Sequence, residues 1–343
     1  MLVLLFGLVA LSSCTGSPPP VPGPSTVTPS ASSSASVIPT PTDPAQTWAD
    51  THVDWAIDEA LAALAADPRN DLSHVVHHPV TEQASLTATQ RGIYDDMVAK
   101  MRAVKLYCFS KSDDTVDHVN EVVAAWDAIY SDLPELAIYS GISAQGTCQL
   151  GLNYTVLSSG AIANAADLGH ARSEATSFLD VARRIVQRIP QGASTYDKYR
   201  YLAYVESLIT AYAFFSLDAS GAVKNGYDWV DSAYAALVTG QAVCGGYAEA
   251  YFILCHMAGL WCQQVIGSVT GSTQEHAWNL VRLDSGTYFV DVTWSSNNGS
   301  GGSKSRIGSD AWMQYFMMDE ATASVDHSAD VKATGSASAL MPR

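Results

Sequence analysis

The stretch Gln241-Ala242-Val243-Cys244-Gly245-Gly246-Tyr247 carries the strongest fold signal in the chain. The turn dipeptide Thr239-Gly240 precedes it. Apolar residues at helical spacing follow it, namely Tyr247, Ala250, Tyr251, Leu254 and Ala258. Gly259 then marks a helix end, because glycine is common just past the last turn. The pattern predicts a helix with Cys244 just ahead of its first turn.

This position favours reactivity at Cys244. The unpaired backbone N–H groups and the positive dipole end of a helix stabilise a thiolate and lower the thiol pKa. The two glycines leave room for a substrate carbonyl. Backbone N–H groups there can form an oxyanion hole, and Gln241 is a further candidate donor. The alternative is a buried cysteine that packs as a small apolar residue.

Three predicted strands follow this helix, and the second and third carry the histidine and the carboxylate that a reactive thiol needs. Cys262–Val269 is apolar and predicts a strand. A second strand runs from His276 to Leu283, and after the turn Asp284-Ser285-Gly286 a third returns over Thr287–Trp294. Antiparallel pairing brings the start of one strand beside the end of the other, which places His276 near Asp291.

Cys244, His276 and Asp291 therefore form a candidate catalytic triad. A nucleophilic thiol needs a base to take its proton, and the base needs an acceptor that fixes its tautomer and orientation. The three residue types follow one another along the chain, and two of them lie on neighbouring predicted strands.

The three motifs Val243-Cys244-Gly-Gly-Tyr247-Ala248, His276-Ala277-Trp278-Asn279 and Val290-Asp291-Val292-Thr293-Trp294 resemble those of the transglutaminase-like superfamily, nearest its exported bacterial branch. The clear similarity covers about Tyr196 to Trp294, and the segment from Met317 to His327 resembles the ending usual in that branch. The resemblance implies an α+β fold with a papain-like core, in which a Cys-bearing helix packs against an antiparallel sheet.

The resemblance also implies roles for individual residues. Cys244 is the expected nucleophile, His276 the general base and acid, and Asp291 the orienting carboxylate. We also expect four residues to contact substrate: Gln241, Tyr247, Trp278 and Trp294, although core packing explains the three aromatic residues equally well. No cofactor and no metal are implied.

The N-terminus predicts export. Residues 1–13 are expected to be a signal peptide, because the short apolar run Met1–Leu11 is followed by small residues, although no basic residue precedes that run. Leu11-Ser12-Ser13-Cys14 resembles a bacterial lipobox, which implies lipidation of Cys14. Residues 14–47 are rich in Pro, Ser and Thr and predict a disordered tether. We therefore expect a protein anchored by this lipid to the outer face of a bacterial membrane.

The globular part divides into a helical N-terminal region with short strands (48–190) and a catalytic core (191–330), followed by a disordered tail (331–343). The expected helices are Trp48–Ala66, Thr87–Leu106, Asp117–Tyr130, Ala161–Ile189 and Tyr196–Leu217. Short strands are expected around 137–142 and 151–157. The N-terminal helices are expected to pack on the core, because no linker-like break separates the two regions.

The composition and charge of the chain exclude one class of binding partner. The chain has 343 residues, of which 48 % are hydrophobic, and its net charge is -16. It contains no basic run, so nucleic acid is excluded as a partner. The histidines of Ser73–Pro79 suggest either a solvated loop or, less well supported, a metal site. Oligomeric state is left open.

Four further cysteines are expected either to stay as free thiols or to form disulfides within two pairs. Cys255 and Cys262 are expected to pack as apolar residues, with a disulfide between them as the less favoured alternative. A disulfide between Cys108 and Cys148 is an alternative to free thiols in an oxidising compartment.

The functional prediction is acyl transfer from a peptide or protein amide through a Cys244 thioester. Water as the acceptor gives a peptidase or amidase, and an amine gives a cross-linking enzyme. Hydrolysis is favoured, because water is always available. The alternative is a non-catalytic surface module for binding or assembly.

Overall fold

The structure is a computed structural model, and it describes residues 48–66, 82–103, 105, 107–109, 116–133, 136, 140–145, 148–156, 160–161, 165–214, 230–272, 275–299 and 303–329. The predicted signal peptide, tether and tail and the histidine-containing loop 73–79 lie outside the described residues. Among the described residues, none of the helices combines the length and apolar character needed to cross a membrane.

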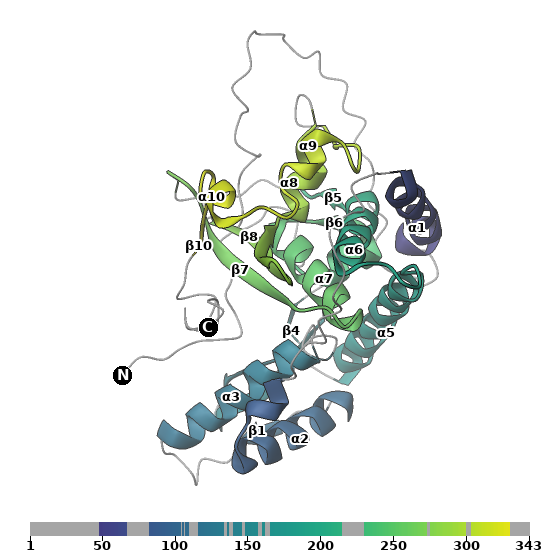
Figure 1. Cartoon of the computed structure of the whole chain (residues 1–343). Helices are drawn as coiled ribbons and strands as arrows, with labels where there is room; N and C mark the ends of the chain where they lie inside the picture. The colour runs from purple at the N-terminus through teal and green to yellow at the C-terminus, as the bar shows by residue number, and fades with distance from the viewer. Residues whose placement is uncertain are drawn as a thin grey trace.

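The core of the molecule is an antiparallel sheet packed against one helix. The sheet has the order β10-β7-β8-β9, built from His327–Ala329, Cys262–Val269, Glu275–Leu283 and Gly286–Val290. The helix α7 (Cys244–Met257) contacts β7 and β8. It lies between the sheet and the helices α5 (Ala165–Gln187) and α6 (Thr195–Ile209), as Figure 1 shows. The predicted α+β fold with a Cys-bearing helix against an antiparallel sheet is confirmed.

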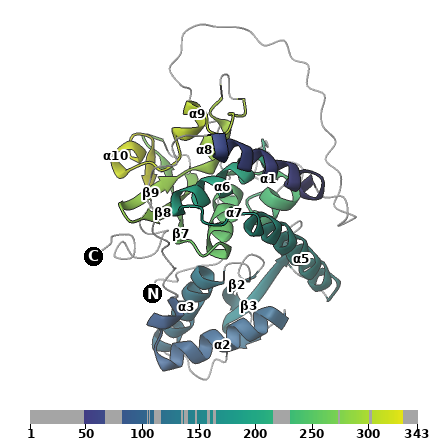
Figure 2. The same ribbon diagram turned by 45° about the vertical axis from the view of Figure 1, so that its right-hand side comes forward.

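The N-terminal region is mostly helical. It contains α1 (Trp48–Ala66), η2 (Glu82–Ser85), α2 (Ala88–Ala103) and α3 (Val116–Asp132). A small antiparallel sheet accompanies α2 and α3 (Figure 2), with strands β1 (Tyr107–Phe109), β2 (Ser140–Gln145), β3 (Cys148–Val156) and β4 (Gly160–Ala161). Thr87 caps α2 as predicted: its hydroxyl accepts from the Gln90 amide, and the Gln90 side chain accepts from the Thr87 amide.

Three short elements lie around α7, and two more follow the sheet. The strands β5 (Ala211–Tyr212) and β6 (Gln241–Ala242) pair in parallel, and a π-helical turn, η4 (Ala235–Thr239), precedes β6. The helices α9 (Asp310–Met313) and α10 (Glu320–Ala323) lie between β9 and β10 along the chain.

Two predicted elements end in the wrong place. The helix predicted to Leu217 stops at Ile209, because Ala211 and Ala213 donate backbone hydrogen bonds to Gly240 and Ala242. The ammonium group of Lys304 also satisfies the carbonyls of Leu208 and Thr210 at that helix end.

The returning strand predicted to Trp294 is the second error. It ends at Val290, and α8 (Val292–Asn297) follows. The Asp291 carboxylate accepts from the Trp294 amide at 2.9 Å and so caps α8. The helix predicted from Ala161 begins at Ala165 instead, because Gly160–Ala161 pairs with β3.

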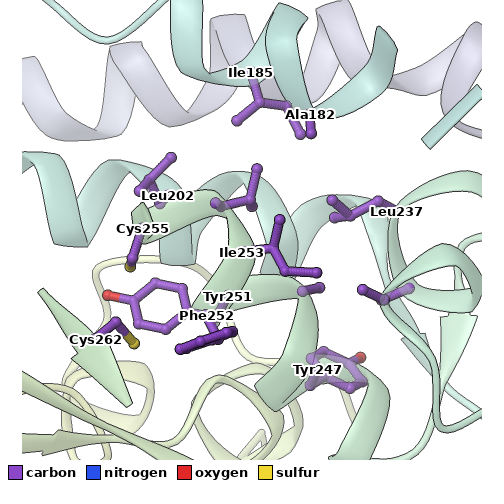
Figure 3. Close-up of a cluster of buried hydrophobic side chains, with 14 of the residues drawn as sticks. Ala182, Ile185, Leu202, Leu237, Tyr247, Tyr251, Phe252, Ile253, Cys255 and Cys262 are labelled. Atoms are coloured by element: carbon purple, nitrogen blue, oxygen red, sulfur yellow. The ribbon is translucent and has the colours of Figure 1, made fainter. Parts of the chain in front are cut away.

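One continuous cluster of buried side chains joins the N-terminal helices to the core. Its members come from α1, α2, α3, α5, α6 and α7, for example Ile57, Met97, Ile129, Phe178, Leu202 and Tyr251. Figure 3 shows the part where Ala182 and Ile185 of α5 face Leu202 of α6 and the side chains of α7. The hydroxyl of Tyr130 in α3 also lies 3.0 Å from Oε1 of Gln264 in β7. The packing of the N-terminal helices on the core is therefore as predicted.

Candidate active site

The N-terminus of α7 is held tightly against the chain before it. Cys244 is the first residue of the helix, one position further in than predicted, and Val243 precedes it in an extended conformation. The Val243 amide donates to the Val230 carbonyl at 2.9 Å. A Cβ at Gly246 would lie 2.8 Å from the Ser232 carbonyl oxygen and 2.9 Å from that of Val230, so glycine is what permits this approach.

Cys244 faces the strand that carries His276. Its side chain forms a small buried cluster with Ala248 and Ala277, the residue next to His276 in β8. The side-chain amide of Asn279 donates to the Ala248 carbonyl at 2.8 Å and fixes β8 against α7. The structure thus brings the thiol-bearing helix end and the histidine-bearing strand together.

His276 and Asp291 form the predicted pair. Nε2 of His276 lies 2.7 Å from Oδ2 of Asp291, and both side chains are buried. The two-residue turn at Asp284-Ser285 sets the register, in which Asn279 pairs with Val290. With Nε2 directed to Asp291, Nδ1 is the ring nitrogen that remains to exchange a proton with a substrate or a thiol.

Several interactions stabilise the negative charge of Asp291. Burial alone would raise the pKa of this carboxyl, but the charge of His276 and hydrogen bonds from His276 and His327 outweigh burial and hold the pKa well below its usual value. Its other oxygen accepts from the Trp294 amide, and its own amide donates to the Tyr315 carbonyl at 2.9 Å. Asp291 is therefore an ionised carboxylate with fixed orientation.

Two of the four predicted substrate contacts flank the imidazole. The Trp294 ring stacks on His276 with centroids 4.6 Å apart, and the Trp278 ring lies at 5.7 Å in a nearly parallel orientation. Both tryptophans are buried. They restrict the rotation of the histidine ring and keep water from the His276–Asp291 hydrogen bond.

The other two predicted contacts are placed differently. Gln241 is partly buried in β6, where its backbone pairs with Ala211. Tyr247 is fully buried in the core, and its hydroxyl donates to the Thr210 carbonyl at 2.9 Å. Substrate contact by these residues stays a prediction, and the predicted lipidation site, Cys14, lies outside the described residues.

The redox state of the cysteines is a finding that the sequence did not suggest. Cys244 is bonded in a disulfide. Cys255 and Cys262 are free and buried, as predicted (Figure 3). The side chains of Cys108 and Cys148 lie outside the described part of the chain, so the disulfide predicted between those two stays a prediction. Thiol chemistry at Cys244 requires reduction of its disulfide first, because the thiolate is the nucleophilic form.

A second histidine joins the site. Nε2 of His327, at the start of β10, lies 3.1 Å from the same Oδ2 of Asp291 that His276 contacts. Reasoning from the sequence missed this residue, although it lies in the segment from Met317 to His327 that resembles the usual family ending.

His276, Asp291 and His327 are also the group of side chains, among the described residues, whose ligand atoms could hold a metal ion, since these atoms lie within 4.8 Å of one another. Their separations of 2.7 and 3.1 Å are those of direct hydrogen bonds. The expectation of a metal-free site stays a prediction.

Comparison with known proteins relates part of the chain to a family. No curated protein matches the chain at a significant level. A family model described as "Transglutaminase-like superfamily" matches residues 183–293, a range that begins within α5 and includes Cys244, His276 and Asp291. This superfamily consists in general of cysteine-dependent enzymes of acyl transfer or hydrolysis. Residues 183–293 therefore match this superfamily in sequence.

Proposed function

We propose that the protein is a cysteine-dependent acyl transferase or hydrolase, in which Cys244 attacks a peptide or protein amide once an external dithiol has reduced its disulfide and has itself become a disulfide. The observation that carries the proposal is the buried His276–Asp291 hydrogen bond of 2.7 Å beside the helix end that bears Cys244. In this mechanism Nδ1 of His276 accepts the thiol proton, the thiolate adds to the amide carbon, and the imidazolium returns the proton to the departing amine.

The thioester that forms is resolved by an acceptor. We infer that water is the main acceptor, so that the protein acts as a peptidase or amidase. Cross-linking by an amine uses the same groups, because His276 can deprotonate either acceptor. Backbone N–H groups in the first turn of α7 are the candidate oxyanion donors, because the first N–H groups of a helix have no acceptor within the helix.

We also propose that the domain works outside the cell, anchored through a lipid on Cys14 and separated from the membrane by the Pro-, Ser- and Thr-rich segment. The support is the sequence pattern of residues 1–47. A disulfide at Cys244 is typical of an oxidising compartment, which also supports export, and catalysis there depends on a dithiol that reduces this bond.

One observation favours a second candidate. A disulfide at Cys244 suits a non-catalytic surface module in which the bond is purely structural. In that case reduction would lower stability and would create no activity.

The test is to incubate the reduced protein with a peptide library, with and without a primary amine, and to read the products by mass spectrometry. Cys244→Ala is the test variant. Cys255→Ala is the matched control, because it removes a free thiol from the same helix. We expect gain of water or exchange of ammonia for the amine with wild type and Cys255→Ala, and no product with Cys244→Ala. A folded, reduced wild type that forms no product would favour the module.

A further inference from the structure

His327 lies between two carboxylates. Its Nε2 is 3.1 Å from Oδ2 of Asp291, and its Nδ1 is 2.6 Å from Oδ1 of Asp326. Both ring nitrogens face acceptors, and both can donate only when the imidazole is protonated. The side chain is 2 % exposed, so water does not compete for either hydrogen bond.

The protonated form is the stable one. Burial by itself would lower the pKa of His327, but the hydrogen bonds to Asp291 and Asp326 and their negative charges raise it to about 9. At neutral pH His327 is therefore a buried cation beside the His276–Asp291 pair.

The groups that face this cation come from several elements. His276 in β8 has its ring centroid 5.6 Å away, and Asp291 precedes α8. Asp326 precedes β10, and the Tyr315 ring lies at 6.1 Å. The Trp278 and Trp294 rings, at 4.8 and 4.5 Å, complete the surroundings. His327 thus neutralises one of two carboxylates in a site that is otherwise walled by aromatic rings.

We propose that His327 is a positioning residue of this site, which fixes Asp291 toward His276 and sets the pH range in which Cys244 is a thiolate. The inference rests on the proposed function, because it assigns His327 a role through that same triad. Asp291 has one oxygen held by Trp294 and the other shared by two histidines, so it cannot rotate away from His276.

The sign of the effect on Cys244 follows from the charge. A nearby cation stabilises a thiolate and disfavours its protonation. Loss of the His327 charge therefore raises the pKa of the Cys244 thiol.

The experiment measures the alkylation rate of Cys244 by iodoacetamide as a function of pH in the reduced protein, with peptide mapping to follow this cysteine alone. The variants are His327→Gln, which removes the charge, and His327→Lys, which keeps it. His170→Gln is the control, because His170 is an exposed histidine in α5. We expect the midpoint for His327→Gln to rise by about one pH unit. His327→Lys should stay closer to wild type, and His170→Gln should not shift.

An unchanged midpoint in folded His327→Gln would overturn the inference, since a merely structural role lowers stability without moving a titration. The proposed function fails separately, if wild-type Cys244 titrates like an ordinary thiol near pH 8.5. Should His327→Gln not fold, His327→Asn decides, because it also removes the positive charge. The midpoint should again rise, and a midpoint that does not rise in the folded variant overturns the inference.

Discussion

Asp291 and Glu206 are both fully buried, yet their pKa values move in opposite directions. Asp291 receives hydrogen bonds from two histidines and one backbone amide, so it keeps its charge. Glu206 has no hydrogen-bond partner for either carboxylate oxygen. Burial, with smaller contributions from the charges of Cys262 and Asp291, raises the pKa of Glu206 well above its usual value. Donors, and not burial, decide which acid is ionised.

Glu206 is therefore expected to cost stability as pH rises. The pKa of Glu206 is near 4.5 in the unfolded chain and higher in the folded chain, so folding takes up a proton at this group when the pH lies between these two values. The free energy of unfolding therefore falls as the pH rises from the lower value to the higher one. Glu206→Gln should gain stability over wild type by up to about 1.4 kcal/mol per pH unit across that range.

Urea denaturation at several pH values measures this gain. Glu59→Gln, at an exposed glutamate in α1, is the control and should show no such trend. A stability difference between Glu206→Gln and wild type that stays constant from pH 4 to pH 8 would contradict the assignment.

At the residue level the sequence predicted part of the site. Cys244, His276 and Asp291 could be predicted because Cys244 lies at the start of a predicted helix, because the other two lie on neighbouring predicted strands, and because the three motifs have family order. His327 was not found, since it is 36 residues from Asp291 and reaches it only after α8, α9 and α10. The separation of two residues along the sequence does not show whether a later strand comes back to pack beside the earlier residue.

At the element scale, Gly267 in β7 controls how the strands approach. It pairs with His276 of β8 on one side and with Ala329 of β10 on the other. A Cβ at this position would meet the Ser328 carbonyl oxygen, Cη2 of Trp278 at 2.7 Å and Cα of Ala329 at 2.8 Å. Two of these three atoms belong to backbone that cannot yield easily.

Gly267→Ala should therefore destabilise the fold by about 1–3 kcal/mol, the typical cost of overpacking. It should also reduce activity, because a shift of β10 moves His327. Gly92→Ala in α2 is the control: no heavy atom lies within 4 Å of its added methyl group. That change should be neutral or gain about 0.5–1 kcal/mol of helix stability. Equal unfolding midpoints for Gly267→Ala and wild type would show that β10 can move aside without loss of stability, and would contradict this prediction.

Helix and strand ends were harder to predict than the elements themselves. The run Ala211-Tyr212-Ala213-Phe214 continues the apolar pattern of α6, yet Ala211–Tyr212 forms the strand β5, because the amides of Ala211 and Ala213 pair with the chain around β6. Asp291 lies inside an apparent strand pattern but acts as a helix cap. In both places a distant or side-chain partner overrides local pattern, which a sequence alone does not display.

At the scale of the whole molecule, the fold class could be predicted because the three motifs resemble those of the transglutaminase-like superfamily, which implies an α+β core with a Cys-bearing helix against an antiparallel sheet. Residues 183–293 match that superfamily. The continuous buried cluster that includes Val53 of α1 and Phe252 of α7 extends this core beyond the matched range. The disulfide at Cys244 could not be predicted, because six cysteines without a strict spacing permit many pairings.

The central claim is that Cys244, activated by His276 and Asp291, forms a thioester after reduction. The most direct measurement is peptide mapping by mass spectrometry after incubation of the protein with an aryl ester as acyl donor. We predict a single acyl group on Cys244 of the reduced protein, removable by hydroxylamine, and none on the oxidised protein or on reduced His276→Ala. Absence of the adduct from the reduced, folded wild type, or an equal adduct in His276→Ala, would contradict the account.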